Sequence, residues 1–386
     1  MIYLDNSATT HPLPDVIRVV QDVMDNIYGN PSSLHRLGLE AERLLTQARQ
    51  IAAEQLGVLK SEIVFTSGGT ESNNMAIKGA AWQYRERGRH LITTEIEHAS
   101  VYQVFQQLEE QGFSVTFLQP EHLGRVTAEQ VASALRDDTI LVSMMAVNNE
   151  IGTVQPIADV AELLHQRTKT LLHVDAVQAF GKVALPAQLA GIDLLSLSGH
   201  KFHAPKGTGL LYVREGVSLQ PLHAGGGQEN GLRSGTENVP AIVGLAKAMQ
   251  ISRKHGEVYQ RQWWKWKQLF INELSKIAGA ALNGDLSETG GAPHIVSVSF
   301  PGVKGEVLLH ALEKRGVFVS TKSACSSKRS VPSRVLAACG LSNEAAEGTL
   351  RISMGQQTEA HHVEQAISAI TDTVKQIRQE TGVNGG

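Results

Sequence analysis

Seven short apolar segments, separated by longer segments of helical character, constrain the fold of this 386-residue chain most strongly. They lie between about residues 60 and 215 and have the sequences EIVFTS, HLITTE, SVTFLQ, ILVSMMAV, LLHVD, DLLSLS and GLLYV. Between them are amphipathic patterns such as PIADVAELLHQRT. Continuously apolar strands that alternate with helices are typical of a mostly parallel sheet covered on both faces. The sequence therefore predicts an α/β fold.

The chain is longer than the size at which single cores usually split into domains. From about residue 290, the segments HIVSVSF, VFVST and LRISM alternate with helical patterns, which indicates a small α+β domain. We expect a large domain over residues 15–255 and a small domain made of residues 1–14 and 256–386. Trp263, Trp264 and Trp266 alternate with lysines and can form a nucleic-acid stacking surface, but an amphipathic helix with inward-packed aromatics is favoured.

Composition excludes several classes of function. The net charge of -3 argues against a general nucleic-acid or membrane-surface binder. No run of about 18 apolar residues predicts a membrane span, and the start, MIYLDNSATTHP, lacks the pattern of a signal peptide. The two cysteines, Cys325 and Cys339, favour a reducing cytoplasm over a disulfide framework.

A lysine follows the sixth apolar segment, in LLSLSGHKFHAPKGTG. Lys201 lies just past the end of a buried strand, where desolvation makes an amine nucleophilic and able to form a Schiff base with an aldehyde cofactor. A solvated loop lysine is the alternative. Lys206 is a second candidate, although Pro205 and the glycines indicate a turn that carries it away. Spacing alone does not separate the two lysines.

Polar residues follow three other strands. Asp175 ends LLHVD, where a carboxylate can hold a protonated ring nitrogen or cap a helix equally well. Gly68, Gly69 and Thr70 lead from a strand into a helix, and a helix N-terminus favours a phosphate. His98 begins a helix and can move protons or stack on a flat ring, although a lone histidine is more often structural. Together these features match the requirements of a pyridoxal phosphate site.

The chain closely resembles the NifS/IscS-type cysteine desulfurases of the class V aminotransferase family, which are fold-type I pyridoxal phosphate enzymes. The resemblance covers nearly the whole length, through YLDNSATT, GNPSSLHRLG, FTSGGTESNN, EIEHASV, VNNEIGTVQPI, HVDAVQAFGK, SGHKFHAPKGTGLLYVR, GGGQENGLRSGTEN, KSACSS and LRISMG. It implies a large domain with a mostly parallel seven-stranded sheet and a smaller α+β domain.

The resemblance also implies residue roles. Lys201 forms the Schiff base, Asp175 pairs with the ring nitrogen, and His98 stacks on the ring and moves protons. Arg351 binds the substrate carboxylate, while Asn149 contacts both cofactor and substrate. Further cofactor contacts come from Gly69, Thr70, Gln178, Ser198 and His200, and from Thr236, which reaches the neighbouring subunit of a homodimer. No metal site is expected.

The implied reaction removes sulfur from L-cysteine, releases L-alanine and leaves a persulfide on Cys325. That residue lies in TKSACSSKRSVPS, whose serines and basic residues suit a mobile arm; Lys322, Lys328 and Arg329 favour the thiolate or merely aid solubility. Cys339, in VLAACGL, is predicted to pack in the core. A selenocysteine lyase, an aminotransferase of the same fold and an inactive sulfur carrier are the alternatives, and Cys325 with Lys201 argues against the last two.

The acceptor of the sulfur is a protein that the sequence does not identify. The chain ends at QETGVNGG, soon after its last helix. Relatives that supply iron–sulfur scaffold proteins usually carry a further C-terminal segment that docks the scaffold. The absence of this segment argues against a scaffold as acceptor, and a dedicated sulfurtransferase for tRNA thiolation or thiamine synthesis is the alternative.

Overall fold

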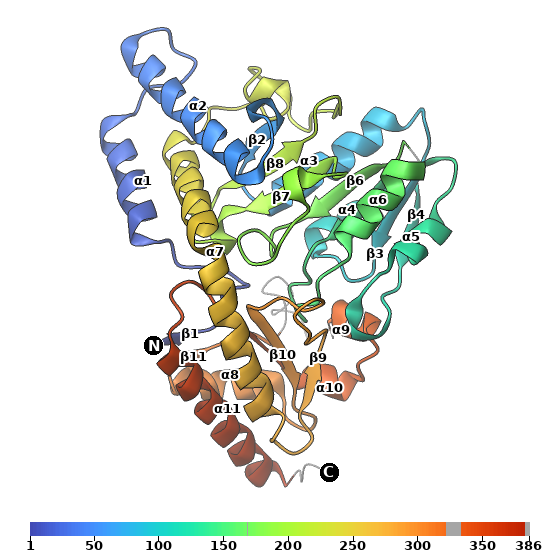
Figure 1. Ribbon diagram of the computed structural model, residues 1–386, viewed down its shortest axis with the longest axis vertical. Coiled ribbons are helices and arrows are strands. Elements are labelled where there is room, and N and C mark those ends of the chain that lie inside the picture. Colours follow the sequence, from blue (N-terminus) through green and yellow to red (C-terminus); the bar gives the residue numbers. More distant parts are fainter. Residues whose placement is uncertain (168, 322–332, 383–386) are drawn as a thin grey trace.

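The computed structural model describes residues 1–167, 169–321 and 333–382, which form a larger and a smaller part joined by one long helix (Figure 1). The larger part contains a seven-stranded sheet with the strand order β2-β8-β7-β6-β5-β3-β4. Its strands are β2 (Ile63–Thr66), β3 (His90–Thr94), β4 (Ser114–Leu118), β5 (Thr139–Met145), β6 (Leu171–Asp175), β7 (Leu194–Ser198) and β8 (Gly209–Val213).

The sheet is parallel except at β8, which pairs antiparallel with both β2 and β7. Each of the seven apolar segments forms one of these strands, so the predicted α/β fold with a mostly parallel seven-stranded sheet is confirmed. Six of the strands are buried along their whole length, and the edge strand β4 is partly exposed. Burial on both faces explains why these strands are apolar without alternation.

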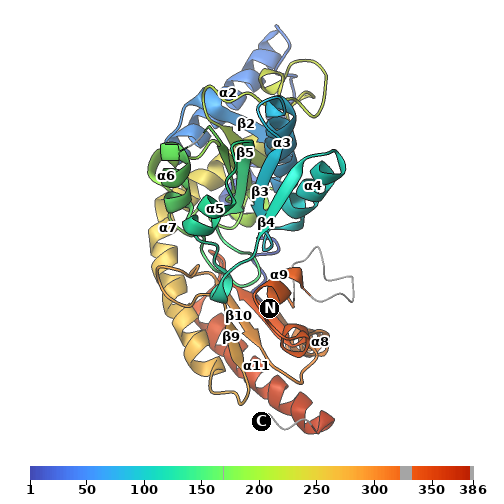
Figure 2. The ribbon, with the colours of Figure 1, turned by 90° about the vertical axis from the view of Figure 1, so that its right-hand side faces the viewer.

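Helices cover both faces of the sheet, as Figure 2 shows edge-on. One face packs on α3 (Gly69–Tyr84) and α4 (Ala99–Glu110). The other packs on α2 (Arg36–Leu56), α6 (Ile157–Arg167) and the first half of α7 (Val239–Leu274). Helix α1 (Pro14–Asn26) lies against α7, and the short α5 (Ala128–Ala134) lies beside α6. This layering places the N-termini of α3 and α4 at the carboxyl ends of the strands.

The smaller part has its own core. An antiparallel sheet of order β12-β10-β9 and a parallel pair, β1-β11, pack against α8 (Gly305–Lys314) and α11 (Ala360–Thr381). The strands are β1 (Ile2–Tyr3), β9 (Ala281–Asn283), β10 (Ile295–Ser299), β11 (Val317–Phe318) and β12 (Thr349–Ser353), and two short helices, α9 (Arg334–Ala338) and α10 (Asn343–Glu347), precede β12.

The second half of α7 carries the tryptophans into this smaller core. Trp263 is 2% exposed and belongs to the core, while Trp266 packs against it half-buried. The inward packing of aromatics on an amphipathic helix is therefore confirmed for these two residues. Since β1 also lies in the smaller part, its core joins both ends of the chain. That packing supports the predicted domain boundaries between residues 14 and 15 and between residues 255 and 256, which we retain as a proposal.

No helix within the described ranges is long and apolar enough to cross a membrane.

Candidate active site

A cavity of about 500 Å³ lies where the carboxyl ends of the central strands face the smaller part. Ligands of open α/β sheets bind at this edge. The cavity is lined by residues from both parts, among them ten of the predicted site residues: Gly69, Thr70, His98, Asn149, Asp175, Gln178, Ser198, His200, Lys201 and Arg351. Residues 282 positions apart in the sequence therefore meet around one space.

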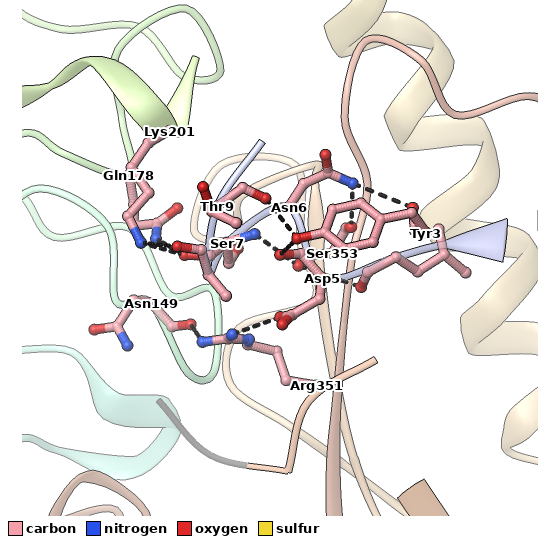
Figure 3. A network of polar contacts seen from close by, with 12 residues as sticks. Tyr3, Asp5, Asn6, Ser7, Thr9, Asn149, Gln178, Lys201, Arg351 and Ser353 are labelled. Carbon is pink, nitrogen blue, oxygen red and sulfur yellow. Dashed lines mark hydrogen bonds and ion pairs between the residues drawn. The ribbon is translucent and has the colours of Figure 1, made fainter. Parts of the chain in front are cut away.

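Lys201 lies half-buried directly after β7, and its ammonium contacts the beginning of the chain. Its Nζ donates hydrogen bonds to the carbonyl oxygens of Ser7 at 2.6 Å and Ala8 at 2.8 Å (Figure 3). Lys206 also borders the cavity but is exposed. Of the two lysines that spacing did not separate, Lys201 is thus the one held inside by fixed contacts.

Asp175 is fixed by two hydrogen bonds at the end of β6. Its Oδ2 accepts from Asn73 Nδ2 at 2.8 Å, and its Oδ1 accepts from the backbone N–H of Val177 at 3.0 Å. The second bond closes the turn after the strand. It is similar to the bond that Asp175 would make in the helix-capping role that the sequence offered as an alternative. The first bond links Asp175 to α3, so the carboxylate has a defined orientation at the cavity wall.

His98 is the N-cap of α4, and its ring is held by the first turn of that helix. Its Nδ1 accepts from the backbone N–H of Ser100 at 3.1 Å and lies 2.8 Å from Ser100 Oγ. Burial lowers the pKa of His98, and the charges of Lys201 and Arg334 lower it further, although Asp175 acts in the opposite direction. The ring is therefore neutral at pH 7, and because Nδ1 is an acceptor, its proton lies on Nε2.

The other end of the cavity is built for an anion. Helix α3 begins at Gly69, and Thr70 follows in its first turn, so its backbone N–H groups carry partial positive charge. Ser198 and His200 close this end from β7. Burial lowers the pKa of His200 to about 4, aided by Lys201 and Lys206, so its ring is neutral. Its Nδ1 lies 3.1 Å from Thr9 Oγ1.

Arg351 enters from β12 of the smaller part and is only 2% exposed. Its Nη1 donates to the carbonyl oxygen of Asn149 at 2.9 Å, and its Nη2 pairs with Asp5 Oδ1 at 2.9 Å. A guanidinium placed in this way suits a carboxylate ligand. In the described part of the chain, no group of three or more His, Cys, Asp or Glu side chains could hold a metal ion.

The N-terminal segment, residues 5–9, contributes Ser7, Ala8 and Thr9 to the cavity lining, although no role was assigned to it from sequence. Ser7 O accepts from both Lys201 Nζ and Gln178 Nε2, the latter at 2.9 Å (Figure 3). The signal available in the sequence was the polar run DNSATT, which begins two residues after strand β1 ends. Asn73 and Ser100 were also missed, and each lies within the first two turns of a helix that faces the cavity.

Six residues singled out from the sequence lie away from this cavity or outside the described residues. Thr236 is exposed and does not line the cavity of its own chain. Cys325 lies outside the described residues, as do Lys322, Lys328 and Arg329. Cys339, predicted to pack in the core, is instead half-buried at the end of α9, where burial raises the pKa of its thiol to about 11.

The comparisons with known proteins agree with this geometry. Residues 2–366 match the model of the family described as aminotransferase class-V. The cysteine desulfurase IscS of Methanosarcina thermophila is 43% identical over 377 residues, which cover 98% of this chain and 93% of the relative. A solved structure of a NifS-like protein superposes with a TM-score of 0.91 at 38% identity, covering 97% of this chain and 99% of that one.

A second solved structure, SspA in complex with cysteine, has a TM-score of 0.80 at 38% identity and covers 92% of this chain and 99% of that one. Because both the family model and the relative extend over nearly the whole chain, the likeness is not confined to the fold of one domain. The chain belongs to the class-V aminotransferase family, in the group of its IscS- and NifS-like members.

Proposed function

We propose that this protein is a pyridoxal phosphate-dependent cysteine desulfurase, which converts L-cysteine to L-alanine and takes up the sulfur as a persulfide on Cys325. The observation that carries the proposal is the single cavity in which Lys201, Asp175, His98 and Arg351 meet. Similarity to proteins named cysteine desulfurase, and to one solved with cysteine, supports the choice of substrate.

The residues of the cavity fit pyridoxal phosphate. Lys201 supplies an amine for the aldehyde, Asp175 a carboxylate for the ring nitrogen, and the start of α3 a cradle for the phosphate. At Gly69 an added Cβ would lie 2.8 Å from Val177 Cγ2, so glycine lets α3 begin close to the end of β6. Ser7 Oγ and Asn73 Oδ1 are buried without a hydrogen-bond partner among the described residues, which leaves polar atoms for a ligand.

In the reaction, the chain's own residues orient the substrate and move protons. The bound cofactor supplies electron withdrawal from the substrate Cα, which weakens the bonds of that carbon. Arg351 holds the carboxylate of cysteine, assisted by Asn149. The amine of Lys201 and the neutral ring of His98, which carries its proton on Nε2, both line the cavity, so they are assigned the proton transfers at Cα.

Cys325 completes the transfer by nucleophilic attack. Its thiolate forms a bond with the sulfur of the substrate, and the bond between that sulfur and the substrate Cβ breaks with its electron pair left on Cβ. Cβ then takes up one proton, and return of the proton to Cα gives alanine. The residues on both sides of 322–332 bond to Arg351, which lines the cavity, or to the neighbour of His98. Before them, Ser320 N donates to the carbonyl oxygen of Arg351 at 3.1 Å, and after them Arg334 Nη2 donates to that of Glu97, beside His98, at 2.5 Å.

We further propose a homodimer. Helices α1 and α2 and the segment between them carry several large apolar side chains that are exposed, namely Ile17, Met24, Tyr28, Leu34 and Leu39. Exposed apolar patches mark interaction sites. Thr236 is exposed, so it is accessible to a second subunit, where it would contact the phosphate. Sedimentation of the cofactor-loaded protein tests the dimer.

The sulfur acceptor is a second protein, either an iron–sulfur scaffold or a sulfurtransferase. Because the carrier is a free thiol, the reaction suits a reducing compartment, and we propose the cytoplasm. To distinguish the two acceptors, protein carrying a persulfide with labelled sulfur is incubated with a scaffold protein or with a sulfurtransferase. The labelled sulfur should move to only one of these acceptors.

The decisive experiment measures alanine and sulfide after incubation of the purified protein with L-cysteine and pyridoxal phosphate. Wild type and Cys339→Ala should both release alanine, because Cys339 is half-buried with a raised pKa. Cys325→Ala should lose at least about 99% of this activity, the loss typical when a nucleophile is removed. Equal alanine release from Cys325→Ala would refute the role of this thiol.

A further inference from the structure

We propose that Asp5 is a positioning residue that orients Arg351 toward the substrate carboxylate; this inference rests on the proposed function. Asp5 comes from the N-terminal segment and Arg351 from β12, yet Arg351 Nη2 lies 2.9 Å from Asp5 Oδ1. The opposite nitrogen, Nη1, donates to the carbonyl oxygen of Asn149 at 2.9 Å. Two fixed acceptors thus define the plane of the guanidinium at the cavity wall.

Backbone pairing explains why Asp5 reaches Arg351. Asp5 forms a parallel bridge with Ser353, two residues after Arg351 on β12. Ser353 N donates to the carbonyl oxygen of Leu4 at 2.7 Å, and Asn6 N donates to that of Ser353 at 3.2 Å. Since side chains two apart on a strand share a face, Asp5 and Arg351 lie on the same side of the paired segments. The pairing therefore fixes the relative position of carboxylate and guanidinium (Figure 3).

The charges of the pair explain why a carboxylate is needed. The side chain of Arg351 is 3% exposed, and that of Asp5 is 21% exposed. A buried cation without a counter-ion is strongly unfavourable, and its side chain would turn toward water or another acceptor. The carboxylate of Asp5 removes this tendency and leaves one donor of the guanidinium unused. Arg351 Nε is buried with no hydrogen-bond partner among the described residues. That N–H remains for an incoming carboxylate.

The same segment also holds the other end of the substrate site. Two and three residues after Asp5, the carbonyl oxygens of Ser7 and Ala8 accept from Lys201 Nζ. Residues 5–8 thus contact both the group that would bind the substrate carboxylate and the amine beside its Cα. Asp5 acts only on the first, so its loss should weaken substrate binding and leave the proton transfers intact.

Steady-state kinetics of the cofactor-loaded protein with L-cysteine tests this. Asp5→Ala should raise KM about tenfold, which corresponds to about 1.4 kcal/mol of binding, and change kcat by less than about twofold, the signature of lost substrate binding. In an Arg351→Lys background, Asp5→Ala should add no more than about a twofold rise, because the two residues act through one contact. An unchanged KM, or the same tenfold rise in both backgrounds, would overturn the proposal.

A matched control separates positioning from stability. Asp193 forms an ion pair with Arg214 at 2.6 Å and lies just before β7, at the strand end away from the cavity. Asp193→Ala should keep the wild-type KM even where it lowers the unfolding temperature. Calorimetric titration with L-alanine requires no turnover, so it measures carboxylate binding even if the protein fails to release sulfur. Equal affinity of wild type and Asp5→Ala for L-alanine contradicts the inference, whereas an inactive wild type contradicts only the proposed function.

Discussion

A buried carboxyl beside His98 gives a prediction whose size follows from the structure. Glu97 is fully buried; its Oε1 accepts from Thr94 Oγ1 at 2.7 Å and from Met145 N at 2.9 Å. Burial raises the pKa of Glu97 from 4.5 to about 8; these two hydrogen bonds oppose the rise, and the carboxylate of Asp175 adds to it. Glu97 is therefore protonated in the folded protein at pH 7, although it is ionised in the unfolded chain.

The consequence for stability has a definite sign. Between pH 4.5 and about 8 the unfolded state loses a proton that the folded state keeps, so the free energy of unfolding falls as pH rises. Each pH unit in this window contributes about 1.4 kcal/mol, which gives a total of about 5 kcal/mol at most. Glu97→Gln removes this titration. Its free energy of unfolding, relative to wild type, should therefore increase by several kcal/mol between pH 5 and pH 8.

Urea unfolding of the cofactor-free protein, followed by circular dichroism at several pH values, measures this difference. Subtracting wild type from variant removes the titrations that both proteins share. Glu54→Gln, on the exposed face of α2, changes the formal charge equally and serves as the control, with no such pH-dependent gain expected. If the Glu97→Gln and wild-type profiles run parallel from pH 5 to pH 8, the carboxyl is ionised in the folded protein and the reasoning fails.

Two further predictions concern the cofactor lysine and the smaller core. Lys201→Ala should lose the visible absorption of bound pyridoxal phosphate after dialysis, whereas the exposed Lys206→Ala should retain it; the reverse result would exchange their roles. Trp263→Ala should lower the free energy of unfolding by about 3–5 kcal/mol, because the ring is 2% exposed and its Nε1 donates to Gly355 O at 3.2 Å. The half-buried Trp264→Ala should cost less, and urea midpoints compare the two.

The larger part was predictable because its chemistry is local in sequence. Each buried parallel strand is apolar on both faces, so it stands out against its flanks, and its carboxyl end marks where a polar residue will face the cavity. Asp175 is the last residue of one such strand and Lys201 lies three residues after the end of another, which is why positions in two separate motifs could be placed together. Spacing did not distinguish Lys201 from Lys206, since exposure depends on how the turn folds.

The contribution of the N-terminal segment was not predictable in the same way. Asp5 meets Arg351 because β1 pairs with β11 and the chain then continues beside β12. Nothing local to residues 5–9 specifies a partner more than 300 residues away. Cys339 shows the complementary error: its apolar neighbours predicted a core position, but α9 has only five residues and leaves its C-terminal end half-buried.

The origin of the cavity walls has a consequence for function. Apart from Thr236 and Ser7 Oγ, the groups proposed to hold the cofactor, from Gly69 to Lys201, lie on one sheet, its helices and the turns between them, whereas binding of the substrate carboxylate by Arg351 depends on β12 and the N-terminal segment. Changes at Asp5 or β12 should therefore weaken substrate binding before they weaken cofactor binding. Lys201 joins the two halves, because its amine rests on the carbonyl oxygens of Ser7 and Ala8. Displacement of this segment would alter the environment of the amine as well as the position of Arg351. An unchanged absorption spectrum of the bound cofactor in Asp5→Ala would therefore indicate that the segment has stayed in place.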